Sequence, residues 1–270
     1  MSPFELAEPG TLSQAFDLLQ DEGARPLSGG TALMLMMKAG VFRPTRLVCL
    51  RKLKLEGIDA APDGGLRIGA MTTLRALERS ERSFPVLKRT LRTLANVRVR
   101  NVATVGGALA HADPHMDLPP LLAALGARVT IAGPGGERSA PVEALYAGYL
   151  ENTLKRNELI TRLELPPLGK RRAAYLKCTT RSADDWPALG MAVMLDGDEA
   201  RVFVSAATDR PTRLAAAERI LKTGDVKRAA EAAAEEVQIE SDLHGSAAYK
   251  KQLIRVYLAR AIHEARNPVH

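Results

Sequence analysis

Two pairs of adjacent glycines, each set among apolar residues, constrain the fold of this chain more than any other feature. The first pair lies in Pro26-Leu27-Ser28-Gly29-Gly30-Thr31-Ala32-Leu33, where a predicted strand turns directly into a predicted helix. The backbone N–H groups of such a turn converge near the positive end of the helix, and glycine lets a ligand approach closely. Residues 27–33 are therefore a candidate phosphate site, with a plain tight turn as the alternative.

The second pair lies in Thr104-Val105-Gly106-Gly107-Ala108. We expect another apolar strand to meet a Gly-Gly turn here, and the turn to hold a second phosphate or a ribityl chain from the side opposite the first. Neither pair fits Gly-x-x-x-x-Gly-Lys-Ser/Thr or Gly-x-Gly-x-x-Gly. An ATPase P-loop and the standard dinucleotide fingerprint are therefore both excluded.

Periodicity along the chain predicts an α+β fold. Thr11-Leu12-Ser13-Gln14 has the form of a capping box and begins a helix to residue 22. Strands at 25–28 and 45–50 around a helix at 32–39 form a small β-α-β unit that ends near residue 55. Residues 56–168 mix strands at 65–68, 128–132 and 158–165 with helices at 72–80, 84–94 and 118–125, in an α+β subdomain.

The C-terminal part is predicted to form a separate α+β domain. Pro166-Pro167 ends the preceding strand, and the polar residues 169–172 are the best candidate linker. Strands at 173–180, 190–195 and 200–207 give a three-stranded antiparallel sheet, and helices at 212–223, 226–237 and 246–264 give a helical layer. The predicted division is an N-terminal domain of residues 1–168, split at residue 55, and a C-terminal domain of residues 169–270.

Charge and composition narrow the possible partners. The net charge is +7, but the basic residues are scattered, and no nucleic-acid module follows the short concentrations at 88–100 and 170–172. Aromatic residues make up only 4% of the chain, which argues against base-stacking platforms. We expect a solvated basic surface, or one that faces an acidic partner subunit, in preference to a nucleic-acid site.

Cysteine usage and hydropathy indicate a cytoplasmic protein. Cys49 and Cys178 are far apart and form no Cys-x-x-Cys pair for zinc or an iron–sulfur cluster, so we expect two buried reduced thiols. The first residues have no basic stretch followed by an apolar one, so no signal peptide is expected. No run approaches the roughly 20 apolar residues of a membrane span.

Several further motifs, taken in order, carry a resemblance that covers nearly the whole chain. Beside the two glycine segments these are Ala112-Asp113-Pro114, Asp117-Leu118-Pro119, Glu158-Leu159-Ile160, Tyr175-Leu176-Lys177 with Arg181 and Asp184-Asp185, and Pro211 with Arg213 and Ala217-Glu218. With these motifs the chain resembles the FAD-binding medium subunits of the xanthine dehydrogenase, carbon monoxide dehydrogenase and 4-hydroxybenzoyl-CoA reductase group of molybdenum hydroxylases.

The resemblance implies roles for individual residues. Residues 27–33 would wrap the FAD pyrophosphate, and residues 104–108 would hold the diphosphate and ribityl portion. Asp117 would bind the sugar region by hydrogen bonding, and Leu94 and Ile160 would give apolar contact to the flavin or adenine. Lys177 matches a lysine near the isoalloxazine ring, where a positive charge stabilises the anionic reduced flavin.

The chain departs from the family pattern at three places. Ala108 stands where the family most often has Asn, which removes one side-chain hydrogen bond to the cofactor. Leu94 stands where an aromatic residue is common, and Ala206-Ala207 replace a frequent Gly-Gly. We therefore expect weaker FAD binding than is usual for the family.

The implied function is electron transfer within a larger complex. A molybdopterin-binding large subunit would oxidise the substrate, a 2Fe-2S small subunit would pass electrons onward, and the FAD of this chain would deliver them to NAD, oxygen or a quinone. One alternative is a non-catalytic FAD-binding or assembly module of the same fold, which Ala108 favours. Another is a basic nucleic-acid-binding protein.

Two polar clusters invite other chemistry. His111 and His115 beside Asp113 and Asp117 offer four potential metal ligands, but their spacing matches no known closed site and Pro114 breaks any common helical face. We therefore expect no metal there. Asp184-Asp185-Trp186 contains paired carboxylates, yet a polar turn between two strands explains it better than acid–base catalysis.

Overall fold

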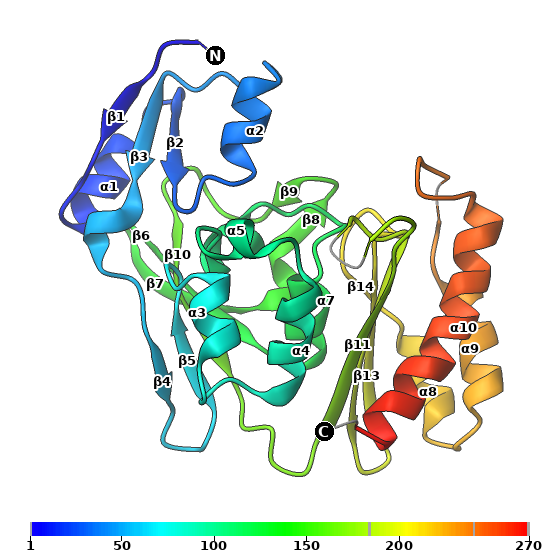
Figure 1. Ribbon diagram of the computed structural model, residues 1–270. Helices are drawn as coiled ribbons and strands as arrows, with labels where there is room; N and C mark the ends of the chain where they lie inside the picture. Colours follow the sequence, from blue (N-terminus) through cyan, green and yellow to red (C-terminus); the bar gives the residue numbers. More distant parts are fainter. Residues whose placement is uncertain (1, 183–184, 240, 269–270) are drawn as a thin grey trace.

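The computed structural model describes residues 2–182, 185–239 and 241–268, and it has the α+β architecture that the sequence predicts. Three main sheets follow one another along the chain (Figure 1): a parallel N-terminal sheet, a five-stranded antiparallel middle sheet and a four-stranded antiparallel C-terminal sheet. Asp184, which is part of the resemblance, lies outside the described residues.

The N-terminal sheet contains the predicted β-α-β unit and one additional strand. Its order is β1-β3-β2, and β3 pairs in parallel with both neighbours. The three residues of β1 are too few to show a strand periodicity in the sequence. The Thr11 hydroxyl caps α1 by accepting from the Gln14 amide, as predicted, but the Gln14 side chain accepts from Gly10. The elements are β1 (Glu5–Ala7), α1 (Leu12–Leu18), β2 (Ala24–Leu27), α2 (Leu33–Lys38), β3 (Arg46–Cys49) and the 3-10 turn η1 (Leu50–Leu53).

The middle sheet has the strand order β4-β5-β10-β6-β7, and short helices cover it. A small hairpin, β8–β9, projects beside it. The strands are β4 (Ile58–Ala60), β5 (Leu66–Gly69), β6 (Arg128–Gly133), β7 (Gly136–Pro141), β8 (Tyr146–Gly148), β9 (Glu151–Asn152) and β10 (Leu159–Leu165). The helices are α3 (Leu74–Arg79), α4 (Pro85–Thr93), α5 (Val97–Arg100), α6 (Val105–Ala110), α7 (Leu118–Ala124) and the 3-10 turn η2 (Val142–Leu145).

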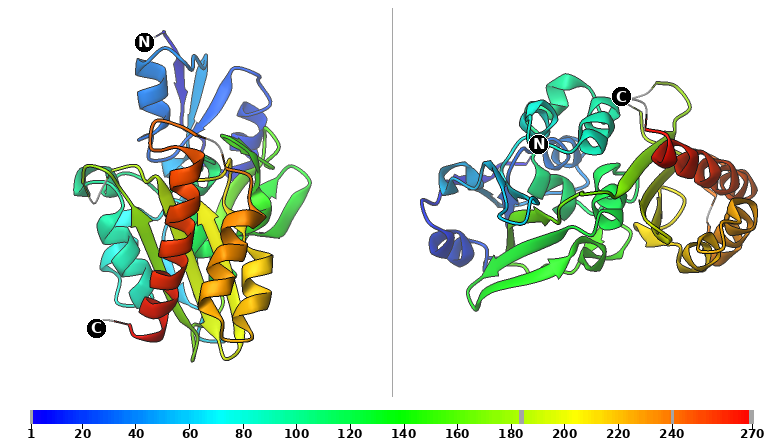
Figure 2. Two further views of the ribbon diagram at one scale, coloured as in Figure 1. Left: turned by 90° about the vertical axis from the view of Figure 1, so that its right-hand side faces the viewer. Right: turned by 90° about the horizontal axis from the view of Figure 1, so that it is seen from below.

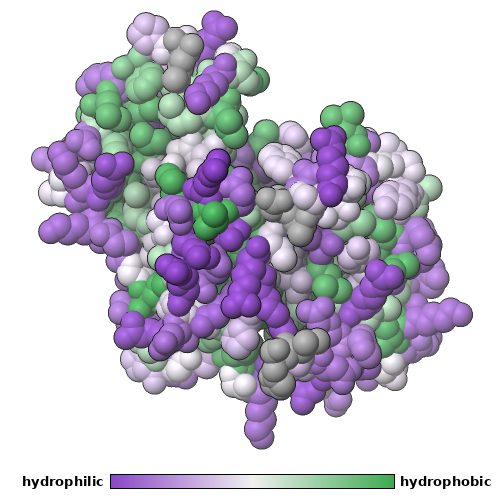
Figure 3. Space-filling model, viewed as in Figure 1, coloured by the Kyte–Doolittle hydropathy of each residue, from purple (hydrophilic) through white to green (hydrophobic). Residues whose placement is uncertain are grey.

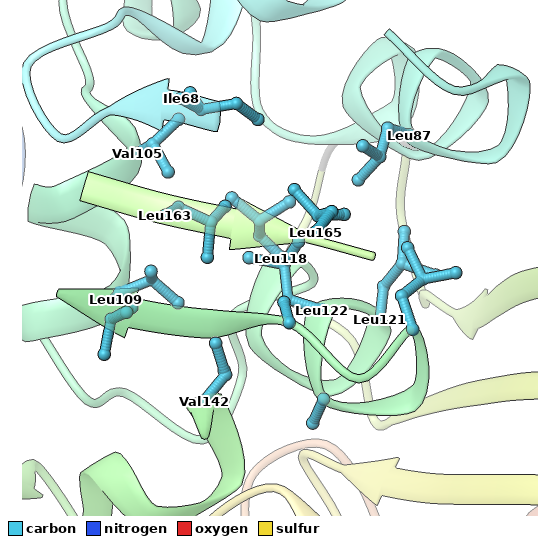
Figure 4. Close-up of a cluster of buried hydrophobic side chains, with 14 of the residues drawn as sticks. Ile68, Leu87, Val105, Leu109, Leu118, Leu121, Leu122, Val142, Leu163 and Leu165 are labelled. Atoms are coloured by element: carbon cyan, nitrogen blue, oxygen red, sulfur yellow. The ribbon is translucent and has the colours of Figure 1, made fainter. Parts of the chain in front are cut away.

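The core of the middle part is built from leucines, as the low aromatic content requires. Figure 4 shows Leu118, Leu121 and Leu122 of α7 pointing toward Leu163 and Leu165 of β10. Every residue of α7 is apolar and buried, so polar side chains occur only in the residues just before the helix. Asp117 stands directly before this helix and is thereby drawn into the interior.

The strand predicted before the second glycine pair is wrong. Two short helices, α5 and α6, occupy this segment, and Gly106 and Gly107 lie in the first turn of α6. Asn96 and Thr104 cap these helices through their side-chain oxygens. The β-branched valines of the segment favoured a strand in the sequence, and the two caps override that preference.

The C-terminal sheet has four strands, so the predicted three-stranded sheet is incomplete. Its order is β11-β12-β13-β14, and the two-residue β14 uses the start of the segment predicted as the first helix. The helices α8 to α10 cover the outer face of this sheet (Figure 2). The elements are β11 (Arg172–Cys178), β12 (Leu189–Asp196), β13 (Glu199–Ser205), β14 (Thr212–Arg213), α8 (Ala215–Leu221), α9 (Val226–Glu236) and α10 (Ala247–Arg266).

The C-terminal sheet is buried on both faces. Along β12, Ala192 and Met194 join the core of the middle part, whereas Met191 and Val193 join the core under the C-terminal helices. Side chains of a strand alternate between faces, so a strand covered on both sides is a continuous apolar run. This sheet therefore packs β12 and β13 against α7, and it places Lys177 of β11 beside Asp117.

Two smaller expectations are settled by burial and hydropathy. Cys49 is buried, but Cys178 is only half-buried, because it lies at the end of β11 with its sulfur 3.9 Å from the Tyr249 hydroxyl. No disulfide joins them. Among the helices of the described residues, none is long and apolar enough to cross a membrane.

Candidate cofactor site

The first glycine turn presents free backbone donors. Gly30 has a φ of 71°, and Ala32 is already in the right-handed helical region. The amides of Gly29, Gly30, Thr31 and Ala32 donate to no other group among the described residues, whereas Met34 donates to the Gly30 carbonyl. A left-handed residue followed by right-handed ones turns successive N–H groups toward one concave point. Such a concavity fits the phosphates of the dinucleotide that the resemblance implies.

The second glycine turn is rigid and offers few free donors. The amides of Val105 and Gly106 donate to the carbonyls of Thr72 and Ala70, at 3.0 and 2.8 Å. Those of Gly107 and Ala108 donate to the Thr104 hydroxyl and carbonyl. This turn can thus offer close backbone approach at the glycines, while the anion-binding donors come from the first turn.

The two turns face each other, as the sequence predicts. The Thr104 hydroxyl donates to the Ser28 hydroxyl at 3.0 Å. A methyl group added to Gly29 would lie 2.2 Å from the Val102 carbonyl oxygen, and one added to Gly107 would lie 2.6 Å from the Ser28 oxygen. Glycine is therefore required at both positions, because the two turns are in contact there.

A buried ion pair forms the other part of the candidate site. The Lys177 ammonium donates to Asp117 Oδ2 at 3.0 Å, and the two side chains are only 8% and 7% exposed. The Tyr175 hydroxyl donates to Asp117 Oδ1 at 2.6 Å. Lys177 also contacts the carbonyls of Thr93, at 2.9 Å, and Asp185, at 3.4 Å. The pair joins the start of α7 to the C-terminal sheet.

Burial dominates the electrostatics of this pair. It raises the pKa of the Asp117 carboxyl, against the opposing attraction of the Lys177 ammonium and the hydrogen bonds from Tyr175 and Lys177. Burial also raises the pKa of the Tyr175 hydroxyl well above its usual value, and the Asp117 charge adds to that shift. Tyr175 is therefore a hydrogen-bond donor at all ordinary pH values.

Leu94 and Ile160, predicted to contact the flavin or adenine, both belong to the core of the middle part. They are 7% and 6% exposed. Leu94 directly follows Thr93, whose carbonyl accepts from Lys177. Ile160 directly precedes Thr161, whose carbonyl accepts from the Ala70 amide, and the Ala70 carbonyl in turn accepts from Gly106. Each is therefore adjacent to one part of the site but has little free surface.

The sequence reasoning missed two functional neighbours of Lys177. Tyr175 was part of the resemblance but was given no role, although residues two apart on a strand point to the same face. The backbone carbonyl of Thr93 carries no side-chain signal, so only the structure reveals it. Together with Asp117 they hold the Lys177 ammonium in one place.

The histidines near Asp113 form a junction between the middle part and the C-terminal helices. His115 Nδ1 lies 3.0 Å from Asp113 Oδ1, and its ring lies 5.3 Å from that of Trp186 and 5.2 Å from that of His244. Burial lowers the pKa of His111, against the opposing charge of Asp113. Within the described part of the chain, no three His, Cys, Asp or Glu side chains are arranged to hold a metal ion.

The outline of the molecule is indented beside the N-terminal lobe. Figure 3 shows the outline drawn inward between the N-terminal lobe at the top and the C-terminal part at the right. Two cavities elsewhere, which share Gly126 and Arg128, contain none of the predicted site residues. Both parts of the candidate site thus lie outside these two cavities.

Comparisons with known proteins show the family to which the chain belongs. A family model described as the FAD binding domain in molybdopterin dehydrogenase matches residues 2–168. A second model, described as the CO dehydrogenase flavoprotein C-terminal domain, matches residues 174–265. The first model covers both glycine turns and Asp117, and the second covers Lys177.

Similar proteins match over almost their whole length. The glyceraldehyde dehydrogenase medium chain of Sulfolobus acidocaldarius is 27% identical over 97% of this chain and 98% of its own. The 6-hydroxypseudooxynicotine dehydrogenase complex subunit alpha of Paenarthrobacter nicotinovorans is 30% identical, over 97% and 96%. The solved carbon monoxide dehydrogenase of Hydrogenophaga pseudoflava matches with a TM-score of 0.93 and 30% identity, over 98% of each chain. The chain therefore belongs to the family of FAD-binding medium subunits of molybdenum-containing dehydrogenases, a family of oxidoreductases with FAD as cofactor.

Proposed function

We propose that this subunit relays electrons through FAD from the iron–sulfur clusters of its complex to an external acceptor. The observation that carries the proposal is the set of free amides at Gly29, Gly30, Thr31 and Ala32, in a turn that contacts the second glycine turn. Bound FAD supplies the ability to exchange electrons one or two at a time. The residues of this chain bind it, orient it and fix the charge around it.

The first glycine turn binds the pyrophosphate. Four convergent N–H donors without partners are suited to two adjacent phosphates, since hydrogen bonds to charged oxygens are stronger than those between neutral groups. The second turn, through Thr104 to Ala108, supports the ribityl side by close backbone contact. Ala108 contributes no side-chain hydrogen bond, so affinity for FAD rests mainly on the first turn.

Lys177 places a positive charge beside the isoalloxazine ring, with Leu94 and Ile160 as apolar neighbours. Its ammonium is held by Asp117 and by the Thr93 carbonyl, and the 3.4 Å contact to the Asp185 carbonyl is the weakest of the three. That third contact is the one that exchanges for a cofactor atom. Asp117, bound to both Tyr175 and Lys177, fixes the position of the ammonium, and the proposal gives its carboxylate the hydrogen bond to the sugar region.

The chain is organised as an FAD-binding domain of residues 1–168, with subdomains of residues 1–55 and 56–168, and a C-terminal domain of residues 169–270. The separate sheets support this division. Partners are a molybdopterin-binding large subunit and a 2Fe-2S small subunit in a cytoplasmic complex. Relatives that carry the names medium chain and complex subunit alpha support an assembly of several chains.

The test is reoxidation of the reduced complex. The complex is reduced with dithionite, freed of excess reductant and mixed with NAD, oxygen or a quinone while cluster and flavin absorbance are followed. A flavin-free preparation is expected to hold reduced clusters at least tenfold longer than the loaded one, and re-adding FAD is expected to restore the rate. Equal reoxidation with and without FAD would contradict the relay.

A second candidate is a non-catalytic FAD-binding or assembly module, which the missing side-chain donor at Ala108 favours. Purification separates the two. The relay requires a yellow complex with one FAD for each copy of this chain. A colourless complex that takes up no FAD yet keeps its large and small subunits would support the assembly role.

A further inference from the structure

Three cations without ion-pair partners in the described part of the chain lie on α4 and α5, the two helices that precede the second glycine turn. Residues 82–112 contain no Asp or Glu, and α4 carries Lys88 and Arg92 four residues apart. Lys88, Arg92 and Arg98 form no ion pair with any acidic side chain among the described residues. Arg92 and Arg98 are exposed and Lys88 is half-buried. We call these three side chains the basic face.

Several other cations, by contrast, are paired with acids. On the C-terminal helices, Arg255 bonds to Glu231 and Glu235, and Lys251 bonds to Glu235. Close to the basic face itself, Arg100 is neutralised by Glu78 at 2.9 Å. Like charges at i and i+4 on a helix repel each other, so Lys88 and Arg92 weaken α4 unless an anion from outside meets them.

The basic face lies next to the ring end of the proposed cofactor site. Arg92 directly precedes Thr93, whose carbonyl accepts from Lys177 at 2.9 Å. Beyond Arg98 the chain reaches Val102, whose carbonyl oxygen touches Gly29 of the first glycine turn. Figure 3 shows strongly hydrophilic residues across the region of α4 and α5, below the indentation. An anion bound at the basic face is therefore held near the Lys177 part of the site.

The shape of this surface suits a macromolecule. Arg92 and Arg98 are exposed on two helices, and none of the three cations lines the cavities around Arg128. Small anionic ligands prefer concave sites that enclose most of their surface. A protein surface needs only complementary charge spread over a flat or convex face.

The composition of the surface suits a transient partner. Permanent interfaces have apolar cores that are depleted of charge, whereas small, charged interfaces are typical of electron-transfer encounters. Val97 and Val102, at 43% and 51% exposure, are the large apolar side chains that stand out beside the basic face. That is too little apolar surface for a permanent subunit contact.

We infer that the basic face docks an acidic electron-carrier protein, which takes electrons from the cofactor. This inference rests on the proposed relay function, and it identifies the acceptor as an acidic one-electron carrier protein. Each one-electron carrier leaves with one electron, so two encounters remove the two electrons stored on the reduced cofactor, and its proton passes to water. Opposite charges accelerate the encounter at low ionic strength, and salt screens the effect over about 10 Å at 0.1 M.

The experiment uses the whole complex and two small haem proteins of opposite charge. Reduced complex is mixed with the acidic soluble domain of cytochrome b5 or with basic cytochrome c, and haem reduction is followed at low and high salt. The test variant is Lys88→Gln/Arg92→Gln/Arg98→Gln. The matched control is Arg219→Gln/Lys227→Gln/Arg228→Gln, which removes three exposed cations from α8 and α9.

For the wild type and the control variant, the second-order rate constant with cytochrome b5 is expected to fall at least tenfold from low to high salt. In the basic-face variant, the low-salt rate is expected to fall about tenfold and its salt dependence to flatten. The affinity for oxidised cytochrome b5, measured by calorimetric titration at low salt, should fall at least fivefold. Reduction of cytochrome c should not fall.

Three outcomes would overturn the proposal. The first is a wild-type rate and affinity for cytochrome b5 in the basic-face variant. The second is an equal loss with a neutral quinone, and the third is loss of a subunit, which would make the face a permanent interface. Failure of the relay itself is distinguishable, because the complex would then lack FAD or would reduce neither haem protein.

Discussion

Gly29 is the residue at which the geometry of the site is least tolerant. Its missing side chain is what lets the first turn touch the Val102 carbonyl, and a methyl group would lie 2.2 Å from that oxygen. The obstacle is backbone, so it cannot rotate away. Gly29→Ala is therefore expected to push the turns apart, to cost about 1–3 kcal/mol of unfolding free energy and to lower bound flavin several-fold. Absorbance at 450 nm for each chain, together with urea unfolding, measures both.

The matched control is Gly135→Ala, because no atom lies within 4 Å of the methyl group it would add. It is expected to keep wild-type flavin content and stability. If Gly29→Ala retains full flavin content while it loses stability, the turn is structural and does not bind the cofactor.

Substitutions at Asp117 and Lys177 are expected to show strong energetic coupling, because both side chains are almost fully buried. Removing one partner of such a pair typically costs about 3–5 kcal/mol, since the other charge is left buried. Asp117→Asn and Lys177→Met should each approach that cost, and the double variant should cost less than their sum by about 1–3 kcal/mol. Urea unfolding of the four proteins gives the coupling energy.

The reference for this cycle is the exposed pair Lys222–Glu199, whose side chains are 49% and 69% exposed. Exposed pairs contribute at most about 1 kcal/mol, so Lys222→Met and Glu199→Gln should be nearly additive. Additive behaviour of the buried pair as well would show that Lys177 and Asp117 are held independently.

Helices and strands with a clear period were predictable, and those set by a cap or a neighbour were not. The apolar run of β12 and the leucines of α7 gave correct elements because each buries its side chains in one known pattern. The segment before Gly106 was predicted wrongly. Its valines are typical of a strand, whereas Asn96 and Thr104 cap helices. That the two turns face each other could be predicted from the chemistry of the glycine pairs. The contact of Thr93 with Lys177 could not be predicted, because only the backbone carbonyl of Thr93 takes part.

The start of α10 depends on one buried lysine. Lys250 is 1% exposed, and its ammonium donates to the Ala206 carbonyl at 3.0 Å and to Asp242 at 2.6 Å. The Ala206 amide in turn donates to the Pro114 carbonyl, so this lysine ties α10 to the segment before Asp117. Lys250→Met is expected to cost about 1–3 kcal/mol, because the Ala206 carbonyl loses its donor while the partly exposed Asp242 regains water.

Lys251→Met is the neighbouring control for this change. Lys251 is 36% exposed and bonds to the exposed Glu235, so its loss should stay within about 0.5 kcal/mol. Urea unfolding midpoints compare the two variants directly. Equal effects would show that the buried contact at Lys250 adds nothing beyond surface charge.

The molecule as a whole brings one site together from three sheets. The N-terminal sheet contributes the free amides, the middle part contributes the second turn and Asp117, and the C-terminal sheet contributes Lys177. Loss of the packing between β12 and α7 would therefore separate Lys177 from Asp117 before it disturbed the first turn. Stability of the whole chain and binding of the ring end of the cofactor should accordingly be lost together when this packing is weakened.

His111 sets the direction in which the unfolding free energy changes with pH. Burial lowers its pKa below the ordinary 6.5, so the unfolded chain binds a proton that the folded chain resists. The unfolding free energy is thus undiminished above about pH 6.5 and falls as the pH drops below it. One proton gives a slope of at most about 1.4 kcal/mol per pH unit. Urea unfolding at steps from pH 7.5 to 5 should show this fall, and His111→Gln should flatten it. A His111→Gln profile as steep as that of the wild type would place the acid sensitivity in other groups.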